Sequence, residues 1–358
     1  MRVAILGCGS IAGIYVRNLL ERFSDRITIT GVCARHPARA RAFAAQFGGL
    51  PVYSNLSALL SDPTVDTVLN LTSPAAHYET TLRALEAGKH VYSEKPLAAV
   101  FSQGATLVER AAQRGLTLWC APDTVLGAAL QSCEAYLRDG LIGTPLGATA
   151  FLLKRGIEDW HPDPAFFYRA GGGPLLDMGP YYLTALVRML GPVESVSGMT
   201  RIPFPSRTIS SGAHAGTSIP VHVPTWATAL LRFRSGALGT LLMTFDAHRS
   251  ALPHLEIYGS AGTLTLPDPD TFSGPVRLRQ DGYDVRELPL RFPFHTGNVR
   301  GLGLYEMEKA LCAGTPSAEN TNIALHVLEI AEAIERSQAA GQVIPLTTTA
   351  LFPLLQKG

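Results

Sequence analysis

The chain has almost no net charge, few cysteines and no long apolar run, and each of these absences excludes a class of protein. Its 358 residues include 30 Lys and Arg and 29 Asp and Glu, which gives a formal charge of +1. Because nucleic acids and anionic membranes are bound through excess positive charge, we expect neither as a partner. No uninterrupted apolar run reaches the roughly 20 residues that cross a bilayer. The sequence therefore predicts a soluble protein.

The cysteines predict neither a disulfide framework nor a zinc site. They are odd in number, widely spaced and without any Cys-x-x-Cys pair: Cys8, Cys33, Cys120, Cys133 and Cys312. Such a pattern is typical of a reducing compartment. The apolar stretch before Cys8 is much shorter than the hydrophobic region of a signal peptide, so we expect no export signal. A cytoplasmic location follows from these observations.

The first third of the chain has the pattern of an α/β domain. Short apolar runs alternate with amphipathic segments. We expect strands at 2–6, 27–33, 65–71, 90–92 and 116–120, and helices at 11–22, 38–47, 75–87 and 100–114. Nearly continuous apolar strands separated by helices indicate a parallel sheet covered on both faces. The sequence predicts a doubly wound Rossmann domain over residues 1–122.

The pattern changes after Pro122, and residues 123–358 are expected to form an α+β domain. A helix at 124–139 precedes strand-like stretches, and segments 225–233 and 238–245 flank a turn at 234–236, as in a hairpin. Residues 203–224 are rich in Pro, Ser, Gly and Thr, so they are interpreted as a long surface arm that could serve assembly. Helices are expected at 303–312 and 320–339, and a closing strand at 342–346.

A glycine-rich turn follows the first strand and opens the first helix. Residues 7–12 read Gly-Cys-Gly-Ser-Ile-Ala and match the pattern G-x-G-x-x-[GA]. The first glycine permits a tight turn, the second lets the backbone approach a diphosphate, and the helix N-terminus receives its charge. The sequence predicts a dinucleotide site that includes Gly7, Gly9, Ser10 and Ile11. An ordinary glycine-rich βα turn is the alternative.

The end of the second expected strand favours NADP over NAD. NAD-specific sites place a carboxylate there to bind the ribose 2′-hydroxyl. The sequence has no acid between Asp25 and Asp62, and Ala34 is followed by Arg35. A guanidinium can hold a 2′-phosphate through two charge-assisted hydrogen bonds. Ala34 and Arg35 are therefore predicted cofactor contacts. Alternatively, Arg35 stacks on the adenine or lies in solvent, which leaves NAD possible.

Three further motifs give the chain a family resemblance. They are Asn-Leu-Thr-Ser-Pro-Ala-Ala-His at 70–77, Glu-Lys-Pro at 94–96 and Gly-Gly-Gly-Pro-Leu-Leu-Asp-Met-Gly-Pro-Tyr at 171–181. With the glycine turn, they make the chain resemble the glucose–fructose oxidoreductase/inositol dehydrogenase/MocA family over nearly its whole length. The resemblance implies a Rossmann domain and an α+β domain with a large, mostly antiparallel open sheet that commonly builds dimers or tetramers. It also implies oxidation or reduction of sugars, inositols or related polyols.

The resemblance also assigns residues. It implies that Lys95 projects between nicotinamide and substrate, and that Asp177 is the acid of the last motif. Many members carry His four residues after that acid, whereas this chain has Tyr181, as in the branch resembling glucose–fructose oxidoreductase and dimeric dihydrodiol dehydrogenase. The other residues matched to cofactor contacts are Thr72, Pro74, His77 and Glu94.

Lys95 and Tyr181 are the two groups that could accept a proton. Removing hydride from a secondary alcohol requires a group that takes the hydroxyl proton and donors that stabilise charge on the oxygen. Free lysine and tyrosine have pKa values near ~10, so burial or a neighbouring cation must lower the pKa of either group for work near neutrality. An ammonium beside the phenol would favour phenolate, and the pair would titrate together. Asp177 would then orient the substrate hydroxyl or Lys95.

Substrate contacts are expected in the segment that precedes the glycine triplet. Trp160, His161 and Arg169 offer aromatic faces and polar groups suited to a carbohydrate ring. Arg155 and His248 are weaker candidates for the same site. No cluster has convincing metal-ligand spacing, and we expect no metal. A glycosidase that uses a retained nicotinamide for transient oxidation and elimination is one alternative function, and a cofactor-binding protein without turnover is another.

Overall fold

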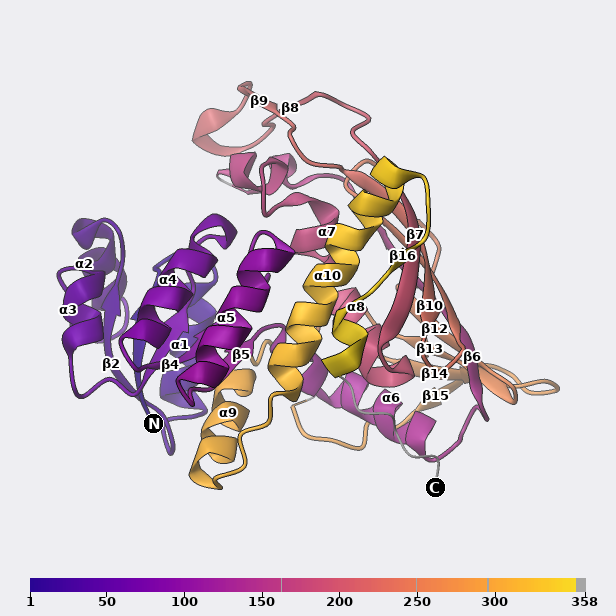
Figure 1. The fold of residues 1–358 in the computed structure, drawn as a ribbon, viewed down its shortest axis with the longest axis horizontal. Coiled ribbons are helices and arrows are strands. Elements are labelled where there is room, and N and C mark those ends of the chain that lie inside the picture. The colour runs from indigo at the N-terminus through magenta and orange to yellow at the C-terminus, as the bar shows by residue number, and fades with distance from the viewer. Residues whose placement is uncertain (162, 249, 295, 352–358) are drawn as a thin grey trace. The chain divides into compact units, whose positions relative to one another are not determined.

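The structure is a computed structural model that describes residues 1–161, 163–248, 250–294 and 296–351 (Figure 1). The last part of the second expected domain, 352–358, lies outside the described residues. The chain divides into two compact units. The first contains residues 1–126 together with 298–325, and the second contains residues 127–297 together with the chain from residue 326 onward. The functional boundary near Pro122 stays a prediction.

The first unit is built on a parallel sheet whose strand order is β2-β1-β3-β4-β5. All of its paired strands run parallel, and the central strands β1 and β3 are almost completely buried, as their apolar sequences require. The order reverses between β1 and β3, the position at which doubly wound sheets bind ligands. The predicted parallel sheet is confirmed, with β1 (Arg2–Leu6), β2 (Thr28–Cys33), β3 (Thr67–Asn70), β4 (His90–Ser93) and β5 (Leu118–Cys120).

The helices of the first unit lie between these strands in sequence. Figure 1 shows α4 and α5 side by side on one face of the parallel sheet. The unit contains α1 (Ala12–Glu21), α2 (Pro37–Ala45), α3 (Leu56–Ser61), α4 (Pro74–Glu86), α5 (Phe101–Gln113) and α9 (Leu302–Cys312). The short helix α3 was not expected from the sequence. It begins after Asn55, whose side chain accepts a hydrogen bond from the backbone N–H of Ala58 at 2.9 Å.

Residues 298–325 belong to the first unit and are held there by hydrogen bonds to a buried carboxylate. Asp123 accepts hydrogen bonds from the backbone N–H groups of Gly301 and Gly303, at 2.7 and 3.3 Å. Burial raises the pKa of Asp123 to about 6, while the Arg300 guanidinium opposes that rise. Gly301 has a φ of 105°, which a residue with a side chain rarely adopts. These contacts fasten α9 beside β5 and could not be foreseen from local sequence.

The second unit is built on a nine-stranded sheet of order β15-β14-β13-β12-β6-β11-β10-β7-β16. Its pairs are antiparallel except for β6 with β11. The predicted hairpin is formed by β10 and β11, and the predicted α+β class is confirmed. The strands are β6 (Pro145–Leu153), β7 (Val193–Arg201), β10 (Trp226–Phe233), β11 (Leu238–Thr244), β12 (Leu255–Gly259), β13 (Gly262–Leu266), β14 (Val276–Arg279), β15 (Arg286–Leu288) and β16 (Ile344–Pro345).

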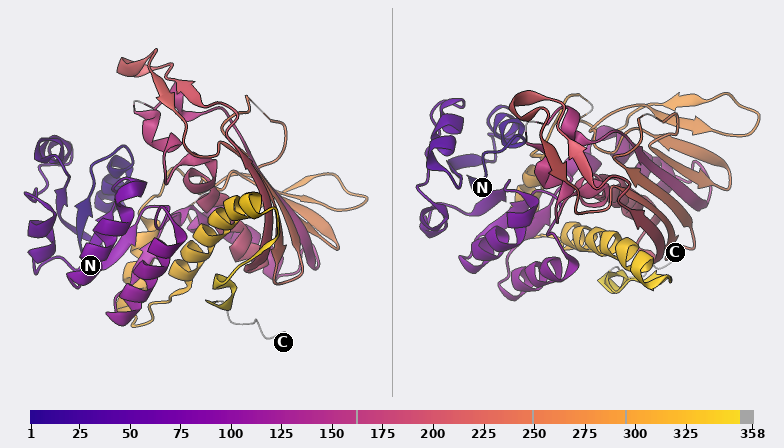
Figure 2. Two further views of the ribbon diagram at one scale, coloured as in Figure 1. Left: turned by 45° about the horizontal axis from the view of Figure 1, so that its top comes forward. Right: turned by 90° about the horizontal axis from the view of Figure 1, so that it is seen from above.

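Helices cover one face of this sheet, and Figure 2 shows α10 running along that face. Strand β10 shows the consequence, because Ala229 and Leu231 are buried whereas Leu230 between them is 62% exposed. The helices are α6 (Ala128–Arg138), α7 (Gly173–Asp177), α8 (Gly179–Leu190) and, from residue 326 onward, α10 (Glu319–Ala340). No helix in the described part of the chain is both long enough and apolar enough to cross a membrane.

The predicted surface arm at residues 203–224 contains a short two-stranded sheet. The segment contains strands β8 (Ser206–Thr208) and β9 (Ser218–Pro220), which pair antiparallel with Arg207 opposite Ile219. Ile209 and Ile219 are buried although the segment is rich in Pro, Ser and Gly. Three-residue strands are too short to show a period of two above that composition, which is why the sequence did not indicate them.

A buried histidine fastens the end of the described chain to the second unit. The backbone N–H of Val193 donates to Nε2 of His326 at 2.9 Å, so the ring proton lies on Nδ1 and is donated to Oγ1 of Thr348 at 2.6 Å. The Thr348 hydroxyl in turn donates to Glu329. Burial lowers the pKa of His326 from 6.5 to about 4, against the opposing charge of Glu329. The neutral ring is therefore part of the folded structure.

This histidine should make the protein less stable in acid. A folded-state pKa below the unfolded value contributes stability above pH 6.5 that is lost as pH falls toward about 4. We expect wild type to lose roughly 2 kcal/mol of unfolding free energy from this group between about pH 7.5 and about pH 5. Urea unfolding of wild type and His326→Gln at both pH values measures the difference. An equal pH dependence in the two proteins would contradict the assignment.

Candidate active site

The glycine turn lies at the carboxyl end of β1 and is packed against the chain that follows β3. The backbone N–H of Gly7 donates to the carbonyl of Cys33 at 2.8 Å. Gly7 has a φ of 108°, and a Cβ at this position would lie 2.4 Å from the carbonyl oxygen of Leu71. A Cβ at Gly9 would instead meet nothing within 4 Å. The turn is therefore closed on the Gly7 side and open above Gly9, where a diphosphate could approach the backbone.

The four neighbouring strand ends bring the predicted cofactor residues to one edge of the sheet. The backbone N–H of Leu71 donates to the Leu6 carbonyl at 2.7 Å, and that of Glu94 donates to the Asn70 carbonyl at 2.9 Å. Because parallel strands end at the same edge, the predicted contacts gather there. They are Gly7, Gly9, Ser10 and Ile11 after β1, Ala34 and Arg35 after β2, Thr72, Pro74 and His77 after β3, and Glu94 and Lys95 after β4.

His77 joins two of these segments from inside the protein. Its ring is fully buried. Nδ1 lies 2.7 Å from the carbonyl oxygen of Pro96, and Nε2 lies 3.0 Å from that of Thr72. Burial lowers the pKa of this imidazole, although the two backbone carbonyls raise it. The His77 ring thus links the Thr72 backbone to the Glu-Lys-Pro segment, and its predicted contact with a dinucleotide stays a prediction.

Glu94 holds the backbone of Lys95 from the other side. Its carboxylate is buried and accepts a hydrogen bond from the Tyr15 hydroxyl at 2.7 Å. The second carboxylate oxygen accepts the backbone N–H of Lys95 at 2.9 Å. Burial raises the pKa of Tyr15 well above its ordinary value, with Glu94 adding to the rise, so the phenol stays a donor. Tyr15 was missed in the sequence because it occupies the apolar face of α1, where an aromatic residue predicts only packing.

The strand end beside the predicted ribose site is positively charged. Ala34 is half-buried and Arg35 is exposed. Arg39, which the sequence analysis did not single out, donates from Nε to the carbonyl of Cys8 in the glycine turn at 3.1 Å. Burial raises the pKa of the Cys8 thiol to about 11, with Arg39 opposing the rise, so the turn carries no thiolate at neutral pH.

The predicted catalytic residues of the second unit lie on two consecutive helices. Asp177 is the last residue of α7 and is half-buried. Tyr181 lies in the first turn of α8 and is buried, with its backbone N–H donating to the Met178 carbonyl at 3.1 Å. Helix α8 begins at Gly179 and Pro180. A break at Met178 separates Asp177 from Tyr181, so the two residues belong to different helices.

The predicted substrate residues belong to a cluster of aromatic rings. The ring of His161 makes edge contacts with Trp160, Phe166 and Phe167, at centroid distances of 5.5, 5.5 and 5.1 Å. Trp160 is 63% exposed, and Arg169 is also exposed. An exposed aromatic face is suited to packing against a sugar ring. Within the described ranges, no three His, Cys, Asp or Glu residues are grouped so that they could hold a metal ion.

Known proteins match the chain along most of its length. Residues 1–121 match the family described as "Oxidoreductase family, NAD-binding Rossmann fold", and residues 130–265 match the "GFO/IDH/MocA C-terminal domain". Myo-inositol 2-dehydrogenase of Thermotoga maritima is 26% identical over 265 residues, 74% of each chain. A dTDP-3,4-didehydro-2,6-dideoxy-alpha-D-glucose 3-reductase of Streptomyces antibioticus is 30% identical over 81% of this chain and 84% of the relative.

The fold is also found in a solved enzyme. Levoglucosan dehydrogenase in complex with NADH and levoglucosan superposes with a TM-score of 0.83 at 20% identity, covering 97% of this chain and 99% of that chain. The Rossmann unit, its glycine turn and these matches define an NAD-binding oxidoreductase. The chain belongs to the glucose–fructose oxidoreductase/inositol dehydrogenase/MocA family. The resemblance seen in the sequence is thus confirmed, as is the predicted enzyme class of dehydrogenase or reductase.

Proposed function

We propose that the protein transfers a hydride between a nicotinamide cofactor and a hydroxyl or carbonyl carbon of a sugar, inositol or related polyol. One observation carries the proposal: the open glycine turn and the twice-anchored Lys95 segment lie at the same edge of one parallel sheet. The matched relatives act on myo-inositol and on a dTDP-linked sugar, which supports a polyhydroxylated substrate.

In this proposal each group has a defined task. The backbone N–H groups of residues 9–11 and the start of α1 bind the diphosphate. The bound nicotinamide supplies the hydride acceptor or donor. Lys95 and Tyr181 hold the proton of the reacting hydroxyl, and Asp177 orients that hydroxyl. Glu94 and His77 keep the Lys95 backbone in place without touching substrate. The effect of Lys95 and Tyr181 variants on the pH profile of kcat decides which of the two accepts the proton.

A substrate panel tests the proposal. The purified protein, with NADP or NAD, is mixed with inositols, aldoses, ketoses and anhydrosugars, and the absorbance of reduced nicotinamide is followed. At least one compound should change the absorbance steadily in proportion to enzyme. A flat response to every polyol and every keto-sugar, with cofactor binding intact by calorimetry, would contradict the proposed reaction.

The preferred cofactor is proposed to be NADP. Arg35 follows β2, Arg39 donates to the Cys8 carbonyl of the glycine turn, and the chain has no acid between Asp25 and Asp62. We predict that Arg35→Ala weakens NADP binding by about tenfold or more, because the 2′-phosphate would lose its charge-assisted hydrogen bonds to the guanidinium. The affinity for NAD should stay the same. Arg41→Ala, which removes an exposed guanidinium from the neighbouring helix α2, is the matched control. An equal change for both cofactors would show that Arg35 does not recognise a 2′-phosphate.

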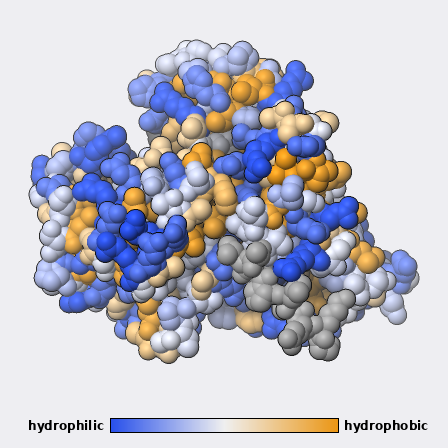
Figure 3. Space-filling view, in the orientation of Figure 1, coloured by the Kyte–Doolittle hydropathy of each residue, from blue (hydrophilic) through white to orange (hydrophobic). Residues whose placement is uncertain are grey.

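The uncovered face of the large sheet is proposed to join subunits into a homodimer or homotetramer. Met199, Thr228, Leu242 and Phe151 stand opposite one another on four adjacent strands, and side chains paired in this way share one face. Met199 is 73% exposed, and Figure 3 shows hydrophobic surface near β7 and β16. Such exposed apolar area favours assembly. A cytoplasmic location is proposed on the reduced state of all five cysteines.

A further inference from the structure

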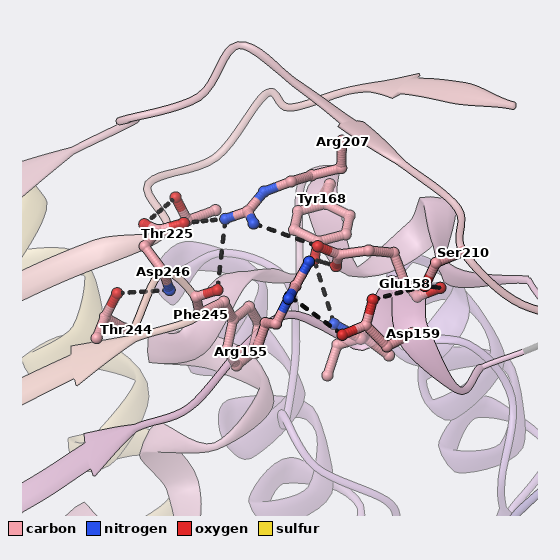
Figure 4. A network of polar contacts seen from close by, with 11 residues as sticks. Arg155, Glu158, Asp159, Tyr168, Arg207, Ser210, Thr225, Thr244, Phe245 and Asp246 are labelled. Atoms are coloured by element: carbon pink, nitrogen blue, oxygen red, sulfur yellow. Dashed lines mark hydrogen bonds and ion pairs between the residues drawn. The ribbon is translucent and has the colours of Figure 1, made fainter. Parts of the chain in front are cut away.

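Arg207 stands between two buried carboxylates of the second unit (Figure 4). From strand β8, its guanidinium donates to Oε1 of Glu158 at 3.2 Å and to Oδ1 of Asp246. The side chains of Arg207, Glu158 and Asp246 are only 11%, 5% and 2% exposed. Buried charges persist in proteins when they are paired and hydrogen-bonded. Among the described residues, Arg207 is the cation that pairs with both carboxylates.

The remaining partners of these carboxylates come from other parts of the chain. The Tyr168 hydroxyl donates to Oε2 of Glu158, and the Thr225 hydroxyl donates to Oδ2 of Asp246 at 2.8 Å. Figure 4 shows that Arg207 reaches both carboxylates from the segment above them. The arm, the segment after β6, the start of β10 and the end of β11 thus meet in one network.

The Glu158–Tyr168 contact closes a loop that holds the predicted substrate residues. These two residues are ten positions apart, and the aromatic cluster of Trp160, His161 and Phe166 lies between them. The Tyr168 hydroxyl also accepts the backbone N–H of Ile157 at 3.3 Å. The conformation of the loop is consequently fixed at its ends by residues that contact Arg207.

Backbone contacts hold the arm on this loop. The backbone N–H of Ser210 donates to the Glu158 carbonyl at 3.1 Å, and that of His222 donates to the Tyr168 carbonyl at 2.8 Å. The Ser210 hydroxyl donates to Oδ1 of Asp159 at 2.6 Å. The arm therefore braces the closed loop within the same unit.

The loop is also coupled to the helix that carries Asp177. The backbone N–H of Gly172 donates to the Arg169 carbonyl at 2.8 Å, and a Cβ at Gly172 would lie 2.4 Å from the Phe167 carbonyl oxygen. A Cβ at Gly173, the first residue of α7, would lie 2.9 Å from the Pro224 carbonyl oxygen. The backbone at Gly172 and Gly173 is thus closely packed against Phe167 and Pro224. We therefore expect a displacement of the loop to displace the first residues of α7.

We propose that Arg207 is a positioning residue for substrate recognition, acting through Glu158 and Tyr168 on the loop of residues 158–168. The inference rests on the proposed function, since that loop carries the proposed substrate contacts Trp160 and His161. Arg207 itself touches neither substrate nor cofactor. Loss of its guanidinium leaves Glu158 and Asp246 buried without their cation, and the loop must open to hydrate them.

Kinetics of Arg207→Met provide the first test, with the natural activity found by the substrate panel. We expect KM for the sugar or polyol to rise by about tenfold or more, while Kd for the nicotinamide cofactor stays unchanged. Arg207→Lys, which keeps the charge but cannot bond two carboxylates in a fork, should give an intermediate KM. The matched control is Arg188→Met, which breaks the half-buried pair of Arg188 with Glu134 at 2.5 Å on α8 and α6. That control should leave KM unchanged.

Hydrogen exchange provides a second readout that needs no activity. Arg207→Met should speed amide exchange in residues 157–169 and 208–222, whereas Arg188→Met should not. Faster exchange together with an unchanged KM in both Arg207 variants would overturn the positioning role. So would wild-type exchange rates in both segments. If wild type turns over no polyol, the proposed function fails, and the exchange result still shows whether Arg207 holds the loop.

Discussion

Replacing Lys95 with Met should lower kcat for hydride transfer by about 10²–10⁴-fold, the usual contribution of a group that moves a proton in the transition state. The backbone of Lys95 is held by Glu94 on one side, and the adjoining Pro96 is held by His77 on the other. Such double anchoring is expected where a reacting group must be placed within a few tenths of an ångström. Steady-state kinetics with the best polyol of the panel measures the loss.

A control variant at a second lysine distinguishes the loss of the reacting amine from the loss of one positive charge. Lys309→Met, in the same unit, removes an exposed ammonium that pairs with Glu306 at 2.9 Å and should leave kcat unchanged. Cofactor affinity of Lys95→Met should stay within about threefold of wild type, which confines the effect to the chemical step. Nearly normal turnover in Lys95→Met would remove this residue from the reaction.

The second large effect is expected at the glycine turn. Substitution of Gly9 should weaken cofactor binding, whereas substitution of Gly7 should lower the stability of the fold. Gly9→Ala adds a methyl group where the protein has nothing within 4 Å, so thermal stability should not change. The same methyl occupies the space through which a diphosphate approaches the backbone. We therefore predict that cofactor affinity falls by about 100-fold, equal to about 2.7 kcal/mol.

Gly7→Ala should mainly destabilise the fold. The new Cβ would lie 2.4 Å from the Leu71 carbonyl oxygen, and the backbone would be held at a φ of 108°. A non-glycine residue in such a conformation costs about 1–3 kcal/mol before the clash is counted. Thermal melting and titration with NADP, carried out on both variants, separate the two effects. A Gly9→Ala protein that binds NADP as wild type does would place the diphosphate elsewhere.

The regular parts of the fold could be predicted because their signals are local. The strands of the first unit are apolar runs, and the hairpin of β10 and β11 alternates with a period of two around a Ser-Gly turn. The return of residues 298–325 to the first unit could not be predicted. It depends on Asp123 receiving backbone N–H groups from residues 178 and 180 positions away, and no local pattern records such a contact.

The identities of the site residues could be predicted from the sequence, but their burial and hydrogen-bond partners could not. The motifs indicated Gly7, His77, Glu94 and Lys95, which lie at one sheet edge in the structure. The structure adds how they are held: the His77 ring is buried and lies within hydrogen-bond distance of two backbone carbonyls, which links Thr72 to the Glu-Lys-Pro segment. Tyr15, 79 positions from Glu94, looks like an ordinary apolar-face residue until the strands are assembled.

Arg207 shows the same limit in the second unit. Its carboxylate partners are 49 and 39 positions away, and no local sequence pattern pairs them with Arg207. A charged residue within a Pro-, Ser- and Gly-rich stretch would ordinarily be assigned to solvent. Only the pairing of β8 with β9 and the burial of Ile209 and Ile219 show that the stretch is folded onto the loop it stabilises.

A crystal structure of the protein with NADP and a polyol substrate is the most direct test of the proposed site. We predict that the diphosphate lies against the backbone N–H groups above Gly9, and that Nζ of Lys95 is within hydrogen-bond distance of the hydroxyl whose carbon faces the nicotinamide. A structure in which the Lys95 amine points into bulk solvent, away from both the nicotinamide and the reacting hydroxyl, would contradict the proposed reaction.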